Sequence, residues 1–287
     1  MRIHLFVNKN RGDALACAQE AATWLENHGV DFAADKESAA RLGMNEVADC
    51  EMQNADFVVC FGGDGTVIRA SHLCSERGTP ILGVHFGRFG FVTQCAGSEV
   101  QMCLSAMADG KVEVEPRMML QAELLRGDAT IATMHALNEI SLQRAVTARM
   151  LVFQVVIDDQ EITRYPADGI VVATPTGSTA YNLSAGGPIV DPSLNAVILT
   201  AVAPHTLSAR PLVLPPASTV LLRVETEGDA VLSADSQTRL HLLSGDQVKV
   251  RRSPRVTNLV RVDPKDFLIK LNERLLWGQW KVPGDAQ

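Results

Sequence analysis

Apolar positions in the first part of the chain form short runs, separated by longer stretches with helical periodicity. The runs predict strands at Ile3–Val7, Phe57–Phe61 and Ile81–Val84, and the periodic stretches predict helices at Ala14–His28, Thr66–Glu76 and Ser98–Asp109. Strands that alternate with helices pair in parallel, because each crossover returns the chain to the same end of the sheet. Residues 1–115 are therefore expected to form a doubly wound α/β domain.

The pattern changes after about Pro116, where short segments alternate apolar and polar residues and are separated by turn signals. These segments predict strands at Leu120–Leu125, Ile131–Leu137, Ile140–Arg144, Leu151–Ile157, Ile170–Thr174, Val220–Val224, Ala230–Ser233 and Gln247–Arg251. Many short strands with regular turns are typical of two packed sheets, so we expect a β-sandwich-like domain over residues 116–263. Residues 264–277 favour a C-terminal helix, and we expect residues 264–287 to pack back on the first domain.

Composition and charge narrow the possible functions. The 287 residues are 46% hydrophobic and 21% charged, with a formal net charge of −7. An acidic chain without a broad basic face is not expected to bind nucleic acid. No apolar run approaches the ~18 residues of a membrane span, so we expect no membrane contact. The six cysteines form no C-x-x-C pair, and we expect a cytoplasmic protein with reduced, mostly buried thiols.

A glycine-rich loop, Gly62-Gly63-Asp64-Gly65, directly follows an apolar strand. Glycine permits positive φ and lets a ligand approach the main chain, and N–H groups at a helix start bind phosphate. We expect a concave anion site suited to a diphosphate, formed by Gly62, Gly63, Gly65, Thr66 and Arg69. Asp64 would then accept a hydroxyl proton or help to hold Mg²⁺. The alternative is a tight turn with Asp64 as a helix N-cap.

Small hydroxyl residues are concentrated in a second segment, from Thr174 to Pro188, which follows a buried strand. Ser178 or Thr179 is expected to cap a short helix that ends at Ser184, leaving amides and hydroxyls directed at one point. Such a wall suits a ribose, a phosphate or an amide, and a nearby tyrosine would stack on a flat ring. Capping alone does not explain so many hydroxyl groups.

A third candidate is the pair Asn138-Glu139 at a strand junction. An adjacent amide and carboxylate grip a cis-diol or an adenine edge, although a simple turn explains the pair equally well.

Taken in this order, the segments resemble the NAD kinase family over about residues 57–265. The resemblance rests on Gly62-Gly63-Asp64-Gly65-Thr66, Gly87-Arg88-Phe89-Gly90-Phe91-Val92-Thr93, Asn138-Glu139, Asp168-Gly169, the Thr174–Pro188 block, Pro204–Val213, Asp235-Ser236-Gln237 and Gly245-Asp246. The Thr174–Pro188 block is highly specific, whereas GGDG also occurs in diacylglycerol and sphingosine kinases. His85 stands where relatives usually carry asparagine, and either a structural role or a substrate contact would explain it.

The resemblance implies roles for individual residues. Asp64 matches the acceptor of the 2′-hydroxyl proton, Asn138 and Glu139 match the pair that binds the NAD adenosine, and Asp168 matches a carboxylate near the nicotinamide end. The remaining NAD-binding positions that it implies are Gly65, Arg149, Thr179, Ala180, Tyr181, Ser184 and Gln237. The family uses a divalent ion such as Mg²⁺, which is expected to be held mainly by the ATP phosphates, and it forms homodimers or homotetramers.

The expected function is an NAD kinase that transfers the ATP γ-phosphoryl group to the 2′-hydroxyl of the NAD adenosine ribose. One alternative is a lipid or sugar kinase that shares the GGDG loop. Another is a non-catalytic sensor that binds NAD or NADP in the same pocket.

Overall fold

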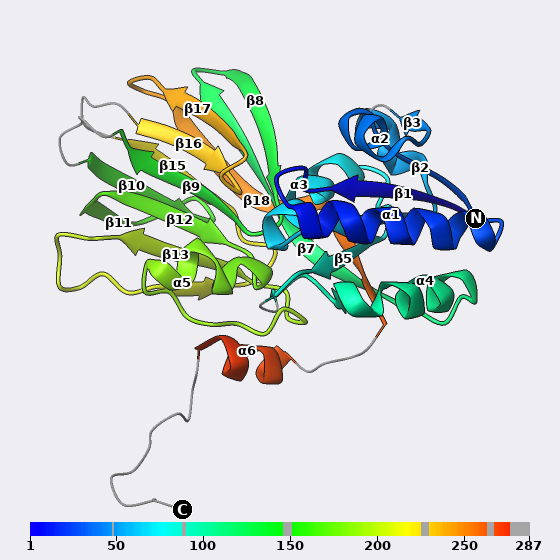
Figure 1. The fold of residues 1–287 in the computed structure, drawn as a ribbon. Helices are drawn as coiled ribbons and strands as arrows, with labels where there is room; N and C mark the ends of the chain where they lie inside the picture. The colour runs from blue at the N-terminus through cyan, green and yellow to red at the C-terminus, as the bar shows by residue number, and fades with distance from the viewer. Residues whose placement is uncertain (48, 88–89, 146–150, 225–229, 263–266, 276–287) are drawn as a thin grey trace, which may run out of the picture. The chain divides into compact units, whose positions relative to one another are not determined.

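The computed structural model describes residues 1–47, 49–87, 90–145, 151–224, 230–262 and 267–275 (Figure 1). Its internal contacts divide the chain into two compact units. The first comprises Met1–Val67, Pro80–Glu115 and the chain from Leu259 onward, and the second comprises Ile68–Thr79 and Pro116–Asn258. The segment Ile68–Thr79 thus groups with the β-rich part of the chain, whereas the domain boundary expected from the sequence places it in the first domain.

The first unit is built on a parallel β-sheet with helices packed against it. Its strands are β1 (Arg2–Val7), β2 (Asp31–Asp35), β3 (Glu46–Val47), β4 (Phe57–Phe61), β5 (Ile81–His85) and β6 (Cys95–Ala96). Its helices are α1 (Gly12–Asn27), α2 (Lys36–Leu42), the start of α3 (Asp64–Cys74) and α4 (Val100–Ala108), with 3-10 turns η1 (Asp49–Asn54) and η2 (Gly97–Glu99). The strand order is β3-β2-β1-β4-β5, and β6 pairs with β5. The predicted N-terminal α/β domain is confirmed.

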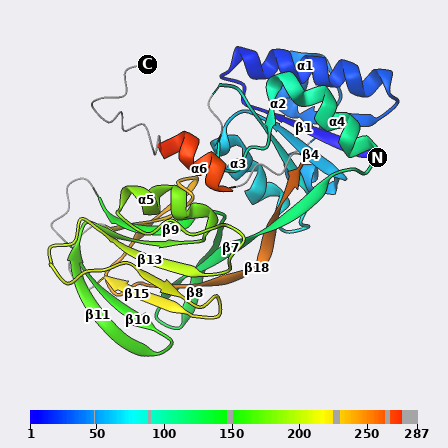
Figure 2. The ribbon, with the colours of Figure 1, turned by 90° about the horizontal axis from the view of Figure 1, so that it is seen from below.

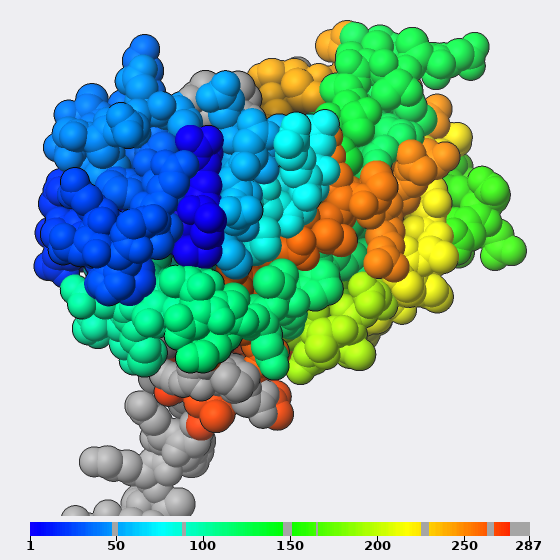
Figure 3. Space-filling view, turned by 90° about the vertical axis from the view of Figure 1, so that its right-hand side faces the viewer, coloured from blue at the N-terminus to red at the C-terminus, as the bar shows by residue number. Residues whose placement is uncertain are grey.

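Helix α1 shows why these residues form this layer. Its small apolar residues recur at helical spacing, and Ala14, Ala18, Ala21 and Leu25 are completely buried. Helices α1 and α4 contact one another, and both contribute to one core with β1, β4 and β5. In Figure 3 the exposed N-terminal end of the chain, in dark blue, lies at the surface of this unit.

The second unit consists of two layers of antiparallel strands (Figure 2). Its strands are β7 (Glu113–Arg126), β8 (Ala129–Ala136), β9 (Glu139–Arg144), β10 (Leu151–Ile157), β11 (Gln160–Ala167), β12 (Gly169–Ala173), β13 (Val197–Val202), β14 (Leu212–Leu214), β15 (Val220–Val224), β16 (Ala230–Ala234), β17 (Thr238–Leu242) and most of β18 (Gln247–Arg261). One layer has the order β14-β13-β12-β9-β16-β17, and the other contains β11-β10-β15-β18 with β7 and β8. Alternating residues such as Phe153 and Val155 on β10 and Leu142 on β9 fill the core between the layers. This arrangement confirms the predicted β-rich C-terminal domain.

The helical segment in the Thr174–Pro188 block differs from the prediction. A 3-10 turn, η3 (Thr176–Thr179), and a short helix, α5 (Tyr181–Ser184), take the place of one helix beginning at Ser178. The break falls at Ala180, whose φ of −98° and ψ of −129° are not helical. Ala180 occupies the N-cap position of α5, where a serine or threonine was expected, and its side chain makes no capping hydrogen bond.

The C-terminal helix α6 (Phe267–Leu275) packs on the first unit, as the sequence predicts. The rings of Phe267 and Phe91 lie with their centroids 6.3 Å apart, and the Arg274 guanidinium lies 5.8 Å from the Phe91 ring centre. On the buried side of the helix, Lys270 Nζ donates to Gln94 Oε1 at 3.0 Å. Helix α6 is therefore tied to residues 91–94.

Candidate functional site

The glycine-rich loop follows β4 and leads directly into α3. The Gly63 carbonyl accepts the N–H groups of Thr66 at 2.9 Å and Val67 at 3.4 Å, so Gly63 occupies the N-cap position. Asp64 is consequently the first residue of the helix and not its cap. The first-turn N–H groups and the positive end of the helix dipole at this end of α3 are the features that attract an anion.

The glycines of this loop serve packing and access, and none of them has positive φ. A Cβ atom on Gly62 would lie 2.2 Å from Oγ1 of the buried Thr66, so only glycine fits there. By contrast, a Cβ on Gly63 or Gly65 would meet no atom within 4 Å. The main chain at these two positions is therefore open to a phosphate group. Of the two reasons for glycine that the sequence suggests, positive φ and access of a ligand to the main chain, the structure supports the second.

The Asp64 carboxylate is anchored by the segment that follows β5. Its Oδ2 accepts the Phe91 N–H at 2.9 Å, and its Oδ1 accepts the Val92 N–H at 3.3 Å. A Cβ atom on Gly90 would lie 1.9 Å from Asp64 Oδ1. The predicted Gly87–Thr93 motif thus holds the carboxylate, although two of its members, Arg88 and Phe89, lie outside the described residues. Arg69 is exposed on the same helix.

A second cluster lies in the second unit, where β9 begins. The N–H groups of Leu137, Asn138 and Glu139 all donate to the Asp235 carboxylate, at 2.7, 2.8 and 3.0 Å. In return, the Asp235 N–H donates to the Glu139 carbonyl at 3.0 Å. The main chain of the Asn138-Glu139 pair is therefore fixed by one aspartate from the β16–β17 hairpin.

Glu139 is a buried carboxyl group with 6% of its surface exposed. One of its oxygens, Oε2, has no hydrogen-bond partner among the described residues, while the Tyr181 N–H donates to the carboxyl group. Burial raises the pKa of Glu139 to about 8, and the neighbouring Asp235 charge adds to the increase. At neutral pH the protonated form of the Glu139 carboxyl is therefore favoured, which makes the group available as a hydrogen-bond donor.

The hydroxyl groups deepest in the Thr174–Pro188 block are used within the protein. The Thr174 hydroxyl donates to the Leu137 carbonyl at 2.6 Å and accepts the Gly177 N–H at 3.0 Å. The Ser178 hydroxyl donates to the carbonyl of Val190 and accepts its N–H, both at 3.0 Å. The interpretation of these hydroxyls as a ligand wall is therefore wrong for Thr174 and Ser178.

The members of this block predicted to line the nucleotide keep some exposure. Thr179, Ala180 and Tyr181 are partly exposed, and Ser184 is exposed. A Cβ on Gly177 would lie 2.1 Å from the Asn138 carbonyl oxygen, so the block and the Asn138-Glu139 pair are in close contact. The second unit thus brings Asn138, Glu139 and the partly exposed face of this block together.

The other predicted site residues occupy separate positions. Asp168 lies between β11 and β12, and its Oδ1 is 2.7 Å from Arg144 Nε. Gln237 is exposed in the β16–β17 turn, where its N–H donates to the Ala234 carbonyl at 2.9 Å. Arg149 lies outside the described residues. His85 is buried on β5.

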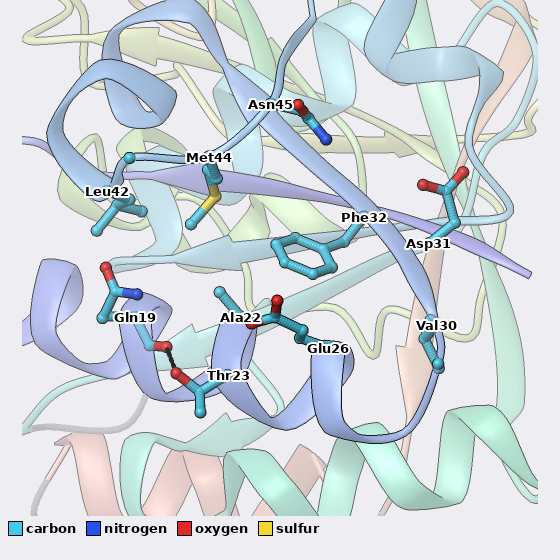
Figure 4. A pocket seen from close by; sticks show the side chains of 12 residues that line it. Gln19, Ala22, Thr23, Glu26, Val30, Asp31, Phe32, Leu42, Met44 and Asn45 are labelled. Atoms are coloured by element: carbon cyan, nitrogen blue, oxygen red, sulfur yellow. Dashed lines mark hydrogen bonds between the residues drawn. The ribbon is translucent and has the colours of Figure 1, made fainter.

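A cavity, metal-binding groups and membrane-spanning helices are further features that can indicate function. A cavity of about 660 Å³ lies in the first unit and is lined by residues of α1, the following Gly29 and Val30, β2 and Leu42–Asn45, none of them a predicted site residue (Figure 4). Within the described ranges, no group of three His, Cys, Asp or Glu side chains is arranged to hold a metal ion. The same part of the chain contains no helix with the length and apolar character of a membrane span.

The structural role of Asp235 was not predicted. Asp235-Ser236-Gln237 is one of the motifs of the resemblance, but only its glutamine had a predicted function. The sequence shows at this point only an Asp-Ser pair between two strands. Because Asp and Ser are common in turns, such a pair predicts a turn and nothing more.

A helix start with open glycines and a single anchored carboxylate is typical of kinases that phosphorylate an alcohol. The ATP-NAD kinase N-terminal domain family matches residues 3–112, and the ATP-NAD kinase C-terminal domain family matches residues 137–262. The chain belongs to the NAD kinase family. The resemblance read from the motifs and the phosphotransferase class are both confirmed.

Relatives match this chain over almost its full length. It is 38% identical to the NAD kinase of Moorella thermoacetica, covering 96% of this chain and 90% of the relative. It is 34% identical to the NAD kinase of Caldanaerobacter subterraneus subsp. tengcongensis, covering 96% and 98%.

Two solved structures share the fold. A yeast NADH kinase complexed with NADH superposes with a TM-score of 0.91 at 25% identity, covering 97% of this chain and 88% of the other. An Archaeoglobus fulgidus NAD kinase in complex with ATP gives 0.77 at 26% identity, covering 95% and 99%.

Proposed function

We propose that this protein transfers the γ-phosphoryl group of ATP to the 2′-hydroxyl of the NAD adenosine ribose, giving NADP and ADP. The observation that carries the proposal is the anchored Asp64 carboxylate at the start of α3, within a loop whose open glycines admit phosphates. The NADH bound to the yeast structure and the ATP bound to the Archaeoglobus structure support the choice of both substrates.

The chemistry assigned to the glycine loop is an in-line displacement. Asp64 accepts the proton of the 2′-hydroxyl while the hydroxyl oxygen forms a bond to the γ-phosphorus. The bond from that phosphorus to the bridging oxygen of ADP breaks at the same time. The main-chain N–H groups at the start of α3 stabilise the charge on the phosphoryl oxygens. A general base of this kind contributes about 10²–10⁴ in rate.

The second unit is proposed to bind NAD. Asn138 and the protonated Glu139 would bind the adenosine, since a neutral donor adds no charge beside an anionic dinucleotide. The further positions proposed for NAD are Gly65, Arg149, Asp168, Thr179, Ala180, Tyr181, Ser184 and Gln237. In this division of roles, residues 1–115 and 264–287 supply the phosphate loop, and residues 116–263 supply the dinucleotide wall.

A divalent ion, Mg²⁺ by preference, would enter with ATP. Because the described residues hold no ready-made cluster of ligands, the phosphates would provide most of its ligands, with Asp64 as the protein carboxylate beside them. The ion would neutralise charge on the transferring group. We also propose a cytoplasmic protein that assembles as a homodimer or homotetramer.

The test is a coupled assay of NADP formation in the wild-type chain and in Asp64→Asn. We expect kcat to fall by about 10²–10⁴ in the variant, with NAD affinity by calorimetry changed less than about threefold, which is under 1 kcal/mol. Asp56→Asn, which alters an exposed carboxylate of the same unit, is the matched control. Near-normal turnover in Asp64→Asn would remove Asp64 from the role of base.

The same assay separates the alternatives. Phosphorylation of a diacylglycerol, a sphingoid base or a sugar in place of NAD would identify a GGDG lipid or sugar kinase. Tight NADP binding by a folded wild-type protein without turnover would identify a sensor.

A further inference from the structure

Asp235 accepts four hydrogen bonds on one buried carboxylate. Three come from the consecutive N–H groups of residues 137–139, and the fourth comes from His72 Nε2, 2.8 Å from Asp235 Oδ2. The Asp235 side chain is completely buried, and that of His72 is 22% exposed. Since an ionised carboxylate only accepts, His72 donates through Nε2–H.

The backbone at Asp235 is held in an unfavourable conformation. Asp235 has a φ of 49° and Ser236 a φ of 57°, and the Gln237 N–H donates back to the Ala234 carbonyl. Positive φ is strained for most residues other than glycine, and more so for Ser236 than for Asp235, whose short polar side chain tolerates it better. Such strain persists where surrounding contacts over-determine it, and it is concentrated at functional sites.

His72 lies on α3, eight positions after Asp64, in the part of this helix that groups with the second unit. The helix that begins at the phosphate loop therefore also supplies the donor that completes the Asp235 cluster. The cluster fixes the main chain of Glu139, a residue proposed to bind the ligand. The side chain of Glu139 is buried, and its Oε2 atom has no hydrogen-bond partner among the described residues.

We propose that His72 and Asp235 are positioning residues for NAD: their hydrogen bond holds the main chain of residues 137–139 so that the side chains of Asn138 and Glu139 meet the adenosine. This inference rests on the proposed NAD site. It predicts that loss of the His72 donor changes the use of NAD and leaves the use of ATP nearly unchanged.

The test compares His72→Gln with His72→Asn in the full-length protein. A glutamine amide nitrogen reaches the position of Nε2, whereas an asparagine amide corresponds to Nδ1 and falls short of Asp235. We expect His72→Asn to raise KM for NAD about tenfold, the effect of losing one charge-assisted hydrogen bond, while KM for ATP changes less than twofold. His72→Gln should stay within about threefold of wild type for both substrates.

His135→Ala is the matched control. His135 is a partly buried histidine of the same unit whose Nδ1 lies 2.8 Å from Ser253 Oγ. We expect this variant to leave both KM values unchanged. A purely structural role of His72 would lower the melting temperature and the active fraction in both His72 variants without separating the two KM values, and that result would overturn the proposal. So would an unchanged KM for NAD in a folded His72→Asn.

Two further measurements cover other outcomes. If His72→Asn does not fold, Asp235→Asn removes the charge while retaining the side-chain shape, and the same rise in KM for NAD is expected; an unchanged value contradicts the proposal. If the wild-type protein itself forms no NADP, the proposed function fails. Calorimetry with NAD then still tests the positioning role, because His72→Asn should bind NAD about tenfold more weakly than His72→Gln.

Discussion

Gly90 and Asp64 are so close that a Cβ atom at position 90 would lie 1.9 Å from Oδ1 of the carboxylate. The space occupied by Asp64 is thus available only because residue 90 has no side chain. The adjacent N–H groups of Phe91 and Val92 hold the carboxylate in that space. The orientation of the proposed base therefore depends on a glycine that need not contact a substrate.

Substituting Gly90 by alanine is expected to displace the Asp64 carboxylate. We expect kcat to fall by about 10²-fold, because a misplacement of roughly 1 Å has an effect of this size, while KM for NAD changes little. Initial rates check this, with Gly12→Ala as the control, since a Cβ on Gly12 meets no atom within 4 Å. A kcat within twofold of wild type would show that Asp64 tolerates the displacement or does not act in the reaction.

Glu139 is expected to make the free energy of unfolding depend on pH. Its pKa rises from 4.5 in the unfolded chain to about 8 in the folded protein, so between these values the folded state holds a proton that the unfolded state has released. The stabilisation is complete below about pH 4.5 and falls by up to ~1.4 kcal/mol per pH unit as the pH rises to about 8. Glu139→Gln removes this dependence.

The measurement is urea unfolding of wild type and Glu139→Gln at pH 5, 6.5 and 8.5. His135, whose pKa is lowered to about 4 chiefly by burial, adds an opposite slope below about pH 6.5 in both proteins, so only their difference is informative. The free energy of unfolding of Glu139→Gln should increase relative to that of wild type as the pH rises. A difference that stays constant would show that Glu139 is ionised in the folded state.

Ser178 is expected to affect stability and not substrate use. Ser178→Ala removes both hydrogen bonds to Val190 and should lower the free energy of unfolding by about 1–3 kcal/mol, with KM for NAD unchanged. Thr179→Ala, one position away and partly exposed, should raise KM for NAD with little change in stability. Chemical denaturation and initial rates of both variants provide the comparison. The reverse pattern would restore Ser178 to the ligand wall.

Helix α6 is expected to influence turnover through residues 91–94. Lys270→Met keeps the length of the side chain but removes its hydrogen bond to Gln94. We expect kcat to fall between about 3-fold and 30-fold, within the range known for small displacements of reacting groups, while KM for NAD is unchanged. Glu273→Ala, on the exposed side of the same helix, should behave like wild type. Equal kcat values in Lys270→Met and Glu273→Ala would show that the contact of α6 with Gln94 has no influence on turnover.

Elements with strong local patterns could be predicted from the sequence. The bounds of β10 and β15 agree residue for residue with the predicted strands, because each is an apolar run interrupted by only one polar residue. Strands β2, β3, β6, β11, β13, β14 and β17 were not predicted. Strands β14 and β17 have few buried side chains, so their pairing depends on a neighbouring strand that the sequence does not identify.

The candidate site divides in the same way. The phosphate loop could be predicted because its glycines and Asp64 are adjacent in the chain. The Asp235 cluster could not be predicted, because its partners lie 96 to 98 and 163 positions before it in the chain. The prediction for Ser178 failed for the same reason, because its hydroxyl group, expected to cap a helix, is hydrogen-bonded to a residue 12 positions away.

Five cysteines are buried with free thiols, and they can report on the opening of the structure. Cys17, Cys60, Cys95 and Cys103 belong to the first unit, and Cys74 belongs to the second. Burial raises the pKa of Cys17 to about 11 and that of Cys74 to about 12, so at neutral pH almost no thiolate is available to an alkylating reagent in the folded state. Pulsed alkylation followed by peptide mass spectrometry would therefore time the exposure of each thiol, and a lag between Cys74 and the other four would show the two units opening in succession.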